Sequence, residues 1–445
     1  MTSLFLATLI FVTLLQSPTP AQQPPTDVVP QAQAALAAVL AGQFARVEEQ
    51  FTGEMKAALP PGRLATLWTT LLAQAGAHKS CEASPRVVAI ADKQMVITKC
   101  QFERAALDVQ FAFDSAGKIS GLAFRPAASA PVPYTLPAYA SPASYAETEV
   151  TIGSGEWVLP ATLTMPAGSG SVPAVVLVHG SGPNDRDETV GASKPFKDLA
   201  LGLASRGIAV LRYDKRTKVH GAKLAALTEF TVREVVIEDV VEAVKVLRAQ
   251  PRIDGARVFV LGHSLGGMLV PRIGVADPSI AGLIVLAGAA RPLEEAIVAQ
   301  MRYLAAADGT ISPEEQQGID EAAALGERVR ALKTEDGKSG RMISGAPASY
   351  WLDLRGYDPP AAAKAVKSPM LILQGERDYQ VTMEEFARWK AALGSRSDVT
   401  FNSYPALNHL FIAGTGPSLP AEYEVPGHVA EEVIRGIAAW ILGRR

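Results

Sequence analysis

The sequence predicts an α/β protein, a doubly wound and mostly parallel sheet preceded by a small α+β domain. After residue 145, short apolar runs alternate with helix-like stretches, which is the pattern of a parallel sheet with helices on both faces. One of these runs ends in a tight glycine-rich turn at 258–268. Before residue 126, two helical stretches are followed by strand-like segments alone, which is the order of an α+β unit.

Length and charge set the limits of this prediction. The chain has 445 residues, 48% of them hydrophobic, which is enough to bury large cores in more than one domain. Its net charge is −3, from 42 basic and 45 acidic residues. The sequence contains no basic stripe and no long acidic run, so nothing in it predicts a nucleic-acid partner. The oligomeric state stays open.

Residues 1–21 have the pattern of a signal peptide. Leu4–Leu15 is a short apolar run, and small residues precede a plausible cleavage point after Ala21. The start of the chain lacks Lys and Arg, which leaves an uncleaved membrane anchor as the alternative. No Cys follows the run, so a lipoprotein anchor is not expected. We expect export to the periplasm or the medium, without stable membrane insertion once the signal is removed.

The sequence contains two cysteines, Cys81 and Cys100. In an exported protein, two cysteines in one small region predict a single disulfide; two buried thiols are the alternative. Neither has an acidic or His cluster beside it in the sequence, so we expect no metal site there.

The small domain is expected over residues 27–125. Val28–Leu59 and Arg63–Gln74 have helical periodicity. Strands are expected at Arg86–Ala91, Met95–Glu103, Ala105–Asp114 and Lys118–Arg125. On this order, and on Gly117-Lys118-Ile119 with the following GLAF, the domain resembles the NTF2-like, DUF3887-type domains that precede some bacterial hydrolases. The sequence of this domain shows no obvious catalytic constellation, so we expect a structural or ligand-binding accessory role. Residues 126–144, rich in Pro and Ala, are expected to be a linker.

Residues 145–445 are expected to form one large α/β domain. A hairpin at Glu147–Ile152 and Trp157–Met165 would precede its buried strands. These are expected at Ala174–Val178, Ala209–Tyr213, Val258–Leu261, Gly282–Ala287, Met370–Leu373 and Val399–Tyr404. Residues 291–367 interrupt the alternation with a mostly helical composition, and we expect a helical lid there; an elaboration of the sheet edge is the alternative.

Gly262-His263-Ser264-Leu265-Gly266 follows an apolar run and precedes a helical stretch. This is a G-x-S-x-G pattern in the strand–turn–helix context that a nucleophilic serine requires. Glycines on both sides allow the chain to reverse sharply, which leaves the serine at the tip of the turn. We therefore predict that Ser264 is a nucleophile.

A serine nucleophile needs a base and a carboxylate that orients the base. His409 lies on the loop after the last predicted core strand, and Asp378 follows the preceding strand and a glycine. The order Ser264, Asp378, His409 is the one found with this motif. The alternatives are Glu376 for the acid and His428 for the base.

The attacked carbonyl oxygen becomes an oxyanion and needs donors already in place. One would be the backbone N–H of Leu265, directly after the nucleophile. The other would come from the turn at 179–183 (HGSGP), with the N–H of Ser181 as first candidate and that of Gly182 as second. We expect His179 to pack behind this turn and hold it through a ring hydrogen bond.

Two polar stretches, 184–188 and 212–216, follow predicted strands. They would either shape the rim of a binding site or, as we favour, form an ion-pair network that supports these loops. In the expected lid, Tyr350-Trp351-Leu352 and Tyr357 would form either a wall for an acyl group or part of the lid core.

Together, the stretches HGSGPNDRDE, KPFKDLA, GLASRGIAVLRYDKR, GHSLGG, LQGERDYQV and NHLF resemble bacterial α/β-hydrolases of the EstD-type serine carboxylesterase group, near the dienelactone-hydrolase-like enzymes. The resemblance implies hydrolysis of small-molecule carboxylic esters by Ser264, Asp378 and His409, without metal or organic cofactor. Dienelactone hydrolases use Cys as nucleophile, so lactone specificity is not implied. The same residues would also serve a thioesterase, an acyltransferase or a peptidase. A binding module on a hydrolase fold is the alternative from another class.

Overall fold

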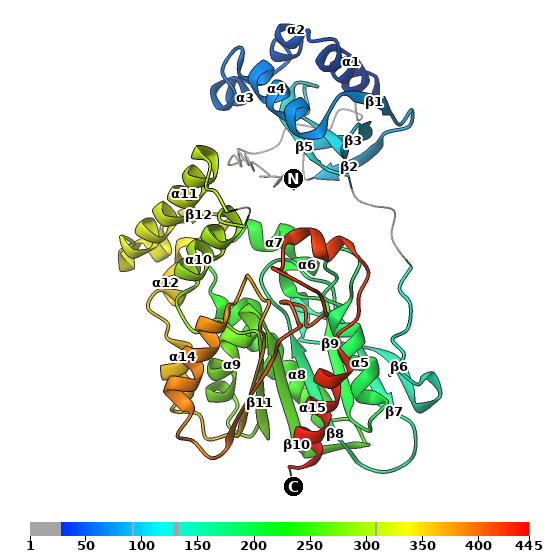
Figure 1. The fold of residues 1–445 in the computed structure, drawn as a ribbon, viewed down its shortest axis with the longest axis vertical. Coiled ribbons are helices and arrows are strands. Elements are labelled where there is room, and N and C mark those ends of the chain that lie inside the picture. Colours follow the sequence, from blue (N-terminus) through cyan, green and yellow to red (C-terminus); the bar gives the residue numbers. More distant parts are fainter. Residues whose placement is uncertain (1–27, 91–92, 128–132, 308, 445) are drawn as a thin grey trace. The chain divides into compact units, whose positions relative to one another are not determined.

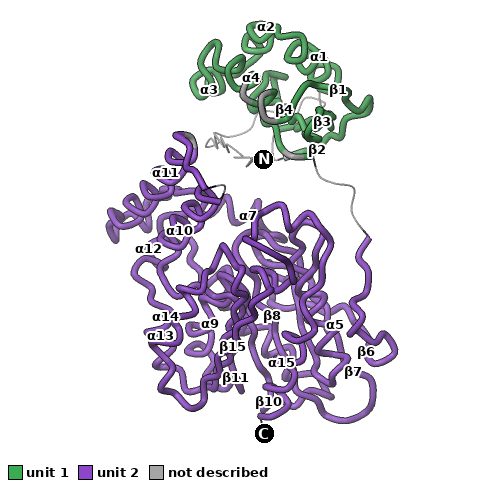
Figure 2. Tube along the Cα trace, viewed as in Figure 1, with its two compact units in different colours: residues 1–131 green, residues 132–445 purple. Residues whose placement is uncertain are grey.

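The computed structural model describes residues 28–90, 93–127, 133–307 and 309–444. The chain divides into two compact units, residues 1–131 and 132–445 (Figure 2). The predicted signal peptide, 1–21, lies outside the described residues. In the described part of the chain, no helix combines the length and the apolar character that a membrane span needs.

The smaller unit consists of helices followed by an antiparallel sheet (Figure 1). Its helices are α1 (Val29–Leu40), α2 (Phe44–Glu48), α3 (Gly53–Ala58) and α4 (Arg63–Ala75). Its strands are β1 (His78–Cys81), β2 (Arg86–Ile90), β3 (Lys93–Phe102), β4 (Ala106–Phe113) and β5 (Ile119–Pro126). The helical stretch expected at Val28–Leu59 is divided into α1, α2 and α3, because Gly42 adopts a φ of +72° and Thr52 caps a new helix. Strand β1 was not predicted.

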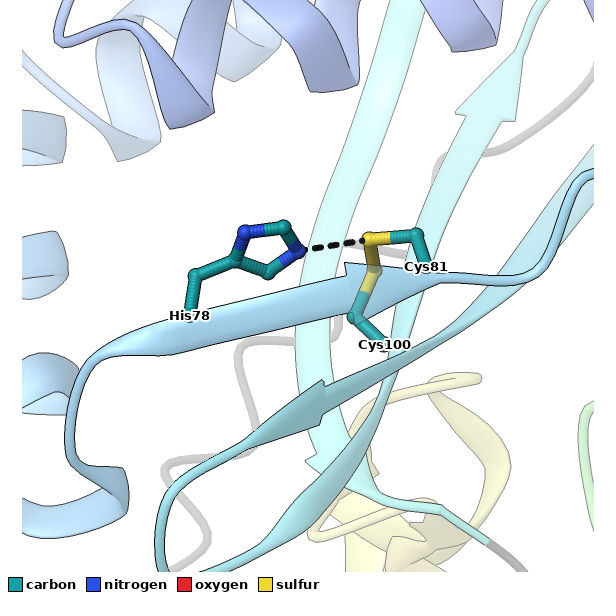
Figure 3. Close-up of a disulfide and its surroundings, with 3 residues drawn as sticks. All are labelled: His78, Cys81 and Cys100. Carbon is teal, nitrogen blue, oxygen red and sulfur yellow. Dashed lines mark hydrogen bonds between the residues drawn. A yellow bond between two sulfur atoms is a disulfide. The ribbon is translucent and has the colours of Figure 1, made fainter.

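The predicted disulfide is present. Cys81 of β1 and Cys100 of β3 are directly paired in the antiparallel ladder and joined through their sulfur atoms. No acidic or His cluster was expected beside them, but a single His lies close: His78 Nε2 is 3.2 Å from the Cys81 sulfur (Figure 3). Among the described residues these three side chains are close enough together to bind one metal ion. Here, however, both cysteine sulfurs are joined in the disulfide.

The larger unit is built on an eight-stranded sheet in the order β15-β14-β11-β10-β8-β9-β7-β6. The strands are β6 (Tyr145–Ile152), β7 (Leu159–Pro166), β8 (Val172–Val178), β9 (Ala209–Tyr213), β10 (Ile253–His263), β11 (Gly282–Leu286), β14 (Met370–Gly375) and β15 (Val399–Tyr404). From β9 to β15 neighbouring strands are parallel, and β6 and β7 form the antiparallel edge. The predicted doubly wound sheet is therefore confirmed.

Helices cover both faces of this sheet (Figure 1). One core packs α8 (Glu238–Arg248), α9 (Leu265–Ala276) and α14 (Met383–Leu393) against the sheet. The other core packs α5 (Pro195–Ala204) and α15 (Glu431–Leu442). The shorter elements are α6 (Arg216–Val219), α7 (Gly221–Ala225), a π-helical turn (Arg233–Ile237) and the 3-10 turns Pro142–Ser144, Gly155–Trp157 and Pro420–Glu424. The loops after β8, β10, β14 and β15 leave the same edge of the sheet, because the carboxyl ends of parallel strands meet there.

The insertion between β11 and β14 is mostly helical. It contains α10 (Leu293–Ala305), α11 (Pro313–Arg330), the 3-10 turn Thr334–Lys338, the two-residue strands β12 (Met342–Ile343) and β13 (Ala346–Pro347), α12 (Ala348–Leu354) and α13 (Pro359–Ala363). Trp351 is buried in the core of the insertion and donates from Nε1 to the Ile343 carbonyl at 2.8 Å. The Tyr357 hydroxyl donates to the Met268 carbonyl of α9 at 3.0 Å. These two aromatic residues therefore serve packing, which favours the lid-core interpretation over an acyl wall.

The boundary between the units lies inside the segment 126–144 that was expected to be a linker. From residue 133 onward this segment packs on the larger unit. The Tyr139 hydroxyl donates to the Val429 carbonyl at 2.7 Å, and its ring fills the space in which a side chain at Gly202 would lie.

Candidate active site

Ser264 lies at the tip of the turn between β10 and α9, with a φ of +53° and a ψ of −117°. This conformation is rare for a residue with a side chain and is held only where the surroundings impose it. A Cβ at Gly262 would lie 2.3 Å from the Gly266 carbonyl oxygen, and one at Gly266 would lie 2.2 Å from the Val178 carbonyl oxygen. The turn therefore requires glycine at both positions.

Asp378 and His409 lie on the loops after β14 and β15 and are in contact. His409 Nδ1 is 2.7 Å from Asp378 Oδ2, and both side chains are buried. Asp378 Oδ1 accepts the backbone N–H groups of Gln380 at 2.8 Å and Val381 at 2.9 Å. A carboxylate held in this way fixes the His409 tautomer with the proton on Nδ1, which leaves the Nε2 lone pair free to act as a base.

The alternative acid and base have other partners. Glu376 is exposed and accepts the Ser403 hydroxyl at 2.8 Å. His428 Nδ1 lies 3.1 Å from Asp198 Oδ1, on another part of the unit. The structure therefore pairs Asp378 with His409 and uses Glu376 and His428 elsewhere.

His263, directly before Ser264, connects the serine turn to the His409 loop. Its Nε2 is 3.0 Å from the His409 carbonyl oxygen, and the two rings lie 4.7 Å apart. Its Nδ1 is 2.8 Å from Glu188 Oε2. Both ring nitrogens face acceptors, an arrangement that a doubly protonated, cationic ring satisfies. Burial by itself would lower the pKa of His263, but the Glu188 carboxylate and the His409 carbonyl outweigh it and raise the pKa.

Glu188 is the anionic partner in this pair. It is 2% exposed, and its Oε1 accepts the backbone N–H of Gly180 at 2.6 Å. Burial would raise its pKa, but the charge of His263 and the hydrogen bond from it lower the pKa overall. One buried ion pair thus joins three segments: the turn after β8, the serine turn and the His409 loop.

The two predicted oxyanion donors belong to the serine turn and to the turn after β8. Leu265 is the first residue of α9, so its N–H has no acceptor within the helix and lies at the positive end of the helix dipole. The turn after β8 touches the serine directly, because a Cβ at Gly180 would lie 3.0 Å from Ser264 Cβ and 3.5 Å from Ser264 Oγ. Ser181 and Gly182 follow in this turn and are exposed.

His179 has the role that the sequence predicts. Its Nε2 is 3.0 Å from the Asp185 carbonyl oxygen, and its ring packs against Phe196 and Tyr213. Burial lowers its pKa to about 4, so the ring is neutral near pH 7 and holds the turn as a hydrogen-bonded, uncharged group.

The polar stretches form the predicted ion-pair network. Arg186 pairs with Asp214 at 2.9 Å and with Glu149 at 2.5 Å. Arg212 pairs with Asp187 and Glu147. Sequence reasoning treated these stretches as a whole and missed the separate roles of Glu188 and Lys215. The available signal was the presence of a charged residue shortly after a buried strand or its glycine turn.

Comparisons with known proteins match both units of the chain. Residues 172–414 match the family described as Hydrolase_4, serine aminopeptidase S33, and residues 32–122 match the DUF3887 family of unknown function. The chain is 41% identical to the esterase EstD of Thermotoga maritima over 392 residues, which cover 88% of this chain and 90% of the relative.

Solved structures give weaker likenesses. A Pyrococcus furiosus esterase is 16% identical with a TM-score of 0.41, over 68% of this chain and 92% of that one. Est1E from Butyrivibrio proteoclasticus is 15% identical with a TM-score of 0.41, over 66% and 99% of the two chains. The sequence relationships are therefore the informative ones. They confirm the predicted resemblance of both units, and they show that this chain belongs to the S33 serine-aminopeptidase family of α/β hydrolases, with a DUF3887 domain before the hydrolase domain.

Proposed function

We propose that this protein is a serine carboxylesterase that hydrolyses small-molecule esters with short to medium acyl chains. The observation that carries the proposal is the 2.7 Å contact between His409 and Asp378, on a loop that is tied through His263 to the strained turn of Ser264. The relative with 41% identity is named an esterase, which supports ester hydrolysis over other uses of the same residues.

The proposed reaction proceeds through an acyl-enzyme. His409 Nε2 takes the proton of the Ser264 hydroxyl as the oxygen attacks the ester carbonyl carbon. The developing oxyanion accepts hydrogen bonds from the backbone N–H groups of Leu265 and Ser181. Asp378 stabilises the imidazolium, which then gives its proton to the leaving alcohol as the ester bond breaks. Water repeats the sequence on the acyl-enzyme and releases the acid.

The test is the S264A variant, assayed with p-nitrophenyl esters of increasing acyl length. We expect kcat to fall by roughly 10⁴-fold or more. The matched control is S395A, which removes the same hydroxyl from an exposed serine after α14. Labelling of the wild type, but not of S264A, by a fluorophosphonate identifies the reactive serine. Retained ester hydrolysis in S264A contradicts the proposal, and an unlabelled wild type would favour a binding module on a hydrolase fold.

A peptidase is the second candidate, because the matching family is described as a serine aminopeptidase. An acyl-enzyme also forms from amides and thioesters, and an alcohol or amine can intercept it where water is excluded. Rates on matched ester, thioester and anilide substrates, with analysis of the products in the presence of an added alcohol, separate these activities. We expect the ester to have the largest kcat/KM and the free acid to be the main product.

We further propose that the protein is exported after removal of residues 1–21. The Cys81–Cys100 disulfide supports this, because such bonds persist in oxidising compartments. Expression of the full chain and sequencing of the mature N-terminus test it. We expect the mature protein to begin at Gln22. A cytoplasmic protein that begins at Met1 would contradict the proposal.

A further inference from the structure

We propose that Lys215 is a positioning residue for the oxyanion site: its buried ammonium group holds and polarises the peptide whose N–H, on Ser181, binds the reacting carbonyl oxygen. The inference rests on the proposed function and adds to it a cation that takes no part in proton transfer. Without this residue the nucleophile, the base and the acid would all remain, but the Ser181 N–H would be a weaker hydrogen-bond donor to the oxyanion.

The contact is direct. Lys215 follows β9 and is 4% exposed, and its Nζ donates to the Gly180 carbonyl oxygen at 2.5 Å. Asn184 Nδ2 donates to the same oxygen at 3.2 Å. A charged donor and a neutral donor thus hold one carbonyl in a fixed direction, and the charged contact is the shorter one.

The direction of that carbonyl decides the direction of the Ser181 N–H. The described residues contain no cis peptide bond, and in a trans peptide the C=O and the N–H point to opposite sides. The Ser181 N–H therefore points away from Lys215. The neighbouring N–H, that of Gly180, is already bound to Glu188 at 2.6 Å. Because Gly180 itself touches Ser264, the turn offers the Ser181 amide as the donor beside the nucleophile.

The chemistry follows from polarisation along a chain of hydrogen bonds. A cation on the carbonyl oxygen draws electron density from the peptide, so the N–H at its other end becomes a stronger donor. This matters most when negative charge develops on the substrate oxygen, and therefore in the transition state. Burial lowers the pKa of Lys215 to about 8, against the opposing charges of Glu188 and Asp239, so the ammonium form dominates at pH 7.

The experiment compares K215M with the wild type at pH 7, using p-nitrophenyl butyrate, a boronic-acid inhibitor that forms a tetrahedral adduct, and the rate of fluorophosphonate labelling. We expect kcat to fall by about 10- to 100-fold, with KM changed by less than about threefold. Boronate affinity and the labelling rate should fall with kcat. K215R should restore part of the loss, because it keeps the charge, and N184A should lose less than K215M.

The matched control is K218M, the same change at an exposed lysine of α6, which should leave every rate unchanged. Equal kcat in K215M and the wild type overturns the inference, as does a loss that appears only in KM while boronate affinity is kept. If K215M does not fold, K215R and N184A provide the test. Losses of kcat in these variants that follow the melting temperature, and not the boronate affinity, overturn the inference. A wild type that hydrolyses no ester refutes the proposed function, and the labelling rates then test Lys215 separately.

Discussion

The larger unit contains two Asp–His pairs with similar contacts and different surroundings. In one, His409 Nδ1 is 2.7 Å from Asp378; in the other, His428 Nδ1 is 3.1 Å from Asp198. Both aspartates are fully buried at the side chain. Both also accept backbone N–H groups, Asp378 from Gln380 and Val381 and Asp198 from Val429.

The difference lies in what surrounds the imidazole. The His409 side chain is 4% exposed, and its own carbonyl is bound by the residue that precedes Ser264. The His428 side chain is 31% exposed, and its Nε2 lies 3.3 Å from Thr135, on the segment that leads into the larger unit. Asp198 also accepts the Tyr134 hydroxyl at 2.8 Å. This second pair therefore fastens residues 134–135 to the start of α15.

The comparison shows that an Asp–His contact is insufficient to identify a catalytic site. Catalytic use depends on a serine held at a sharp turn, on donors for an oxyanion and on links that keep the three loops in register. The Asp378–His409 pair has such links, and the Asp198–His428 pair has a threonine on an extended segment instead.

The largest expected effect comes from removing one charge from each pair. D378N should lower kcat for a p-nitrophenyl ester by about 10⁴-fold, because the imidazole loses its orienting carboxylate and adopts the wrong tautomer. D198N should leave kcat within about twofold and lower the free energy of unfolding by about 1–3 kcal/mol, the usual cost of an impaired buried hydrogen-bonded group. Steady-state kinetics and thermal unfolding of both variants measure this. Comparable losses of kcat would contradict the assignment of different roles.

The next effect concerns the Glu188–His263 pair, which only the His409 site possesses. E188Q leaves the His263 cation without its partner, and breaking such a buried pair costs about 3–5 kcal/mol. Because the pKa of His263 is raised in the folded protein, His263 contributes to the free energy of unfolding. This contribution is fully present below about pH 6.5 and is lost as the pH rises through the folded pKa. Because the pKa of Glu188 is lowered in the folded protein, Glu188 contributes stability that is fully present above about pH 4.3 and is lost as the pH falls through the folded pKa.

The stability difference between wild type and E188Q should therefore be largest at pH 5–6 and shrink toward both higher and lower pH. Urea unfolding at a series of pH values measures it. The matched control, E376Q, changes an exposed glutamate and should stay within about 0.5 kcal/mol of the wild type. A pH-independent difference would show that the pair is not ionised.

A smaller effect is expected from crowding the turn against the serine. In G180A the new methyl group would lie 3.0 Å from Ser264 Cβ and 3.3 Å from Glu188 Oε1, so the turn or the serine must shift. A displacement of this size near reacting groups costs about 10²-fold in kcat. G170A, at a position where a Cβ meets nothing within 4 Å, is the control. Unchanged kcat in G180A would show that the turn moves freely and does not position the oxyanion donor.

Much of this arrangement could be predicted from the sequence because it is encoded locally. Alternating apolar runs gave the sheet, and G-x-S-x-G with an acid and a His behind later strands gave Ser264, Asp378 and His409. The links between distant segments could not be predicted: Glu188 reaches 75 positions to His263, and Lys215 reaches back 35 positions to Gly180. The contact of His78 with the Cys81 sulfur was missed for another reason: the two residues are three positions apart, but the contact depends on the geometry of an unpredicted strand.

The smallest expected effect concerns the insertion, which touches the His409 site through a stack of tyrosines. Tyr303 of α10 stacks on Tyr379 with ring centres 5.6 Å apart, and Tyr379 stacks on Tyr423 at 6.2 Å. Tyr379 follows Asp378 directly, so the stack supports the acid from the insertion side. Y303A should lower the free energy of unfolding by at least the value of one aromatic pair, about 0.5–1.5 kcal/mol, because the buried area of the ring is lost as well. It should lower kcat for a small ester by less than about threefold, because Gln380 and Val381 still hold Asp378. Y303F keeps the ring and should behave like the wild type in calorimetry and kinetics. A loss of kcat in Y303A as large as that in D378N would mean that the insertion, and not the loop after β14, sets the position of the acid.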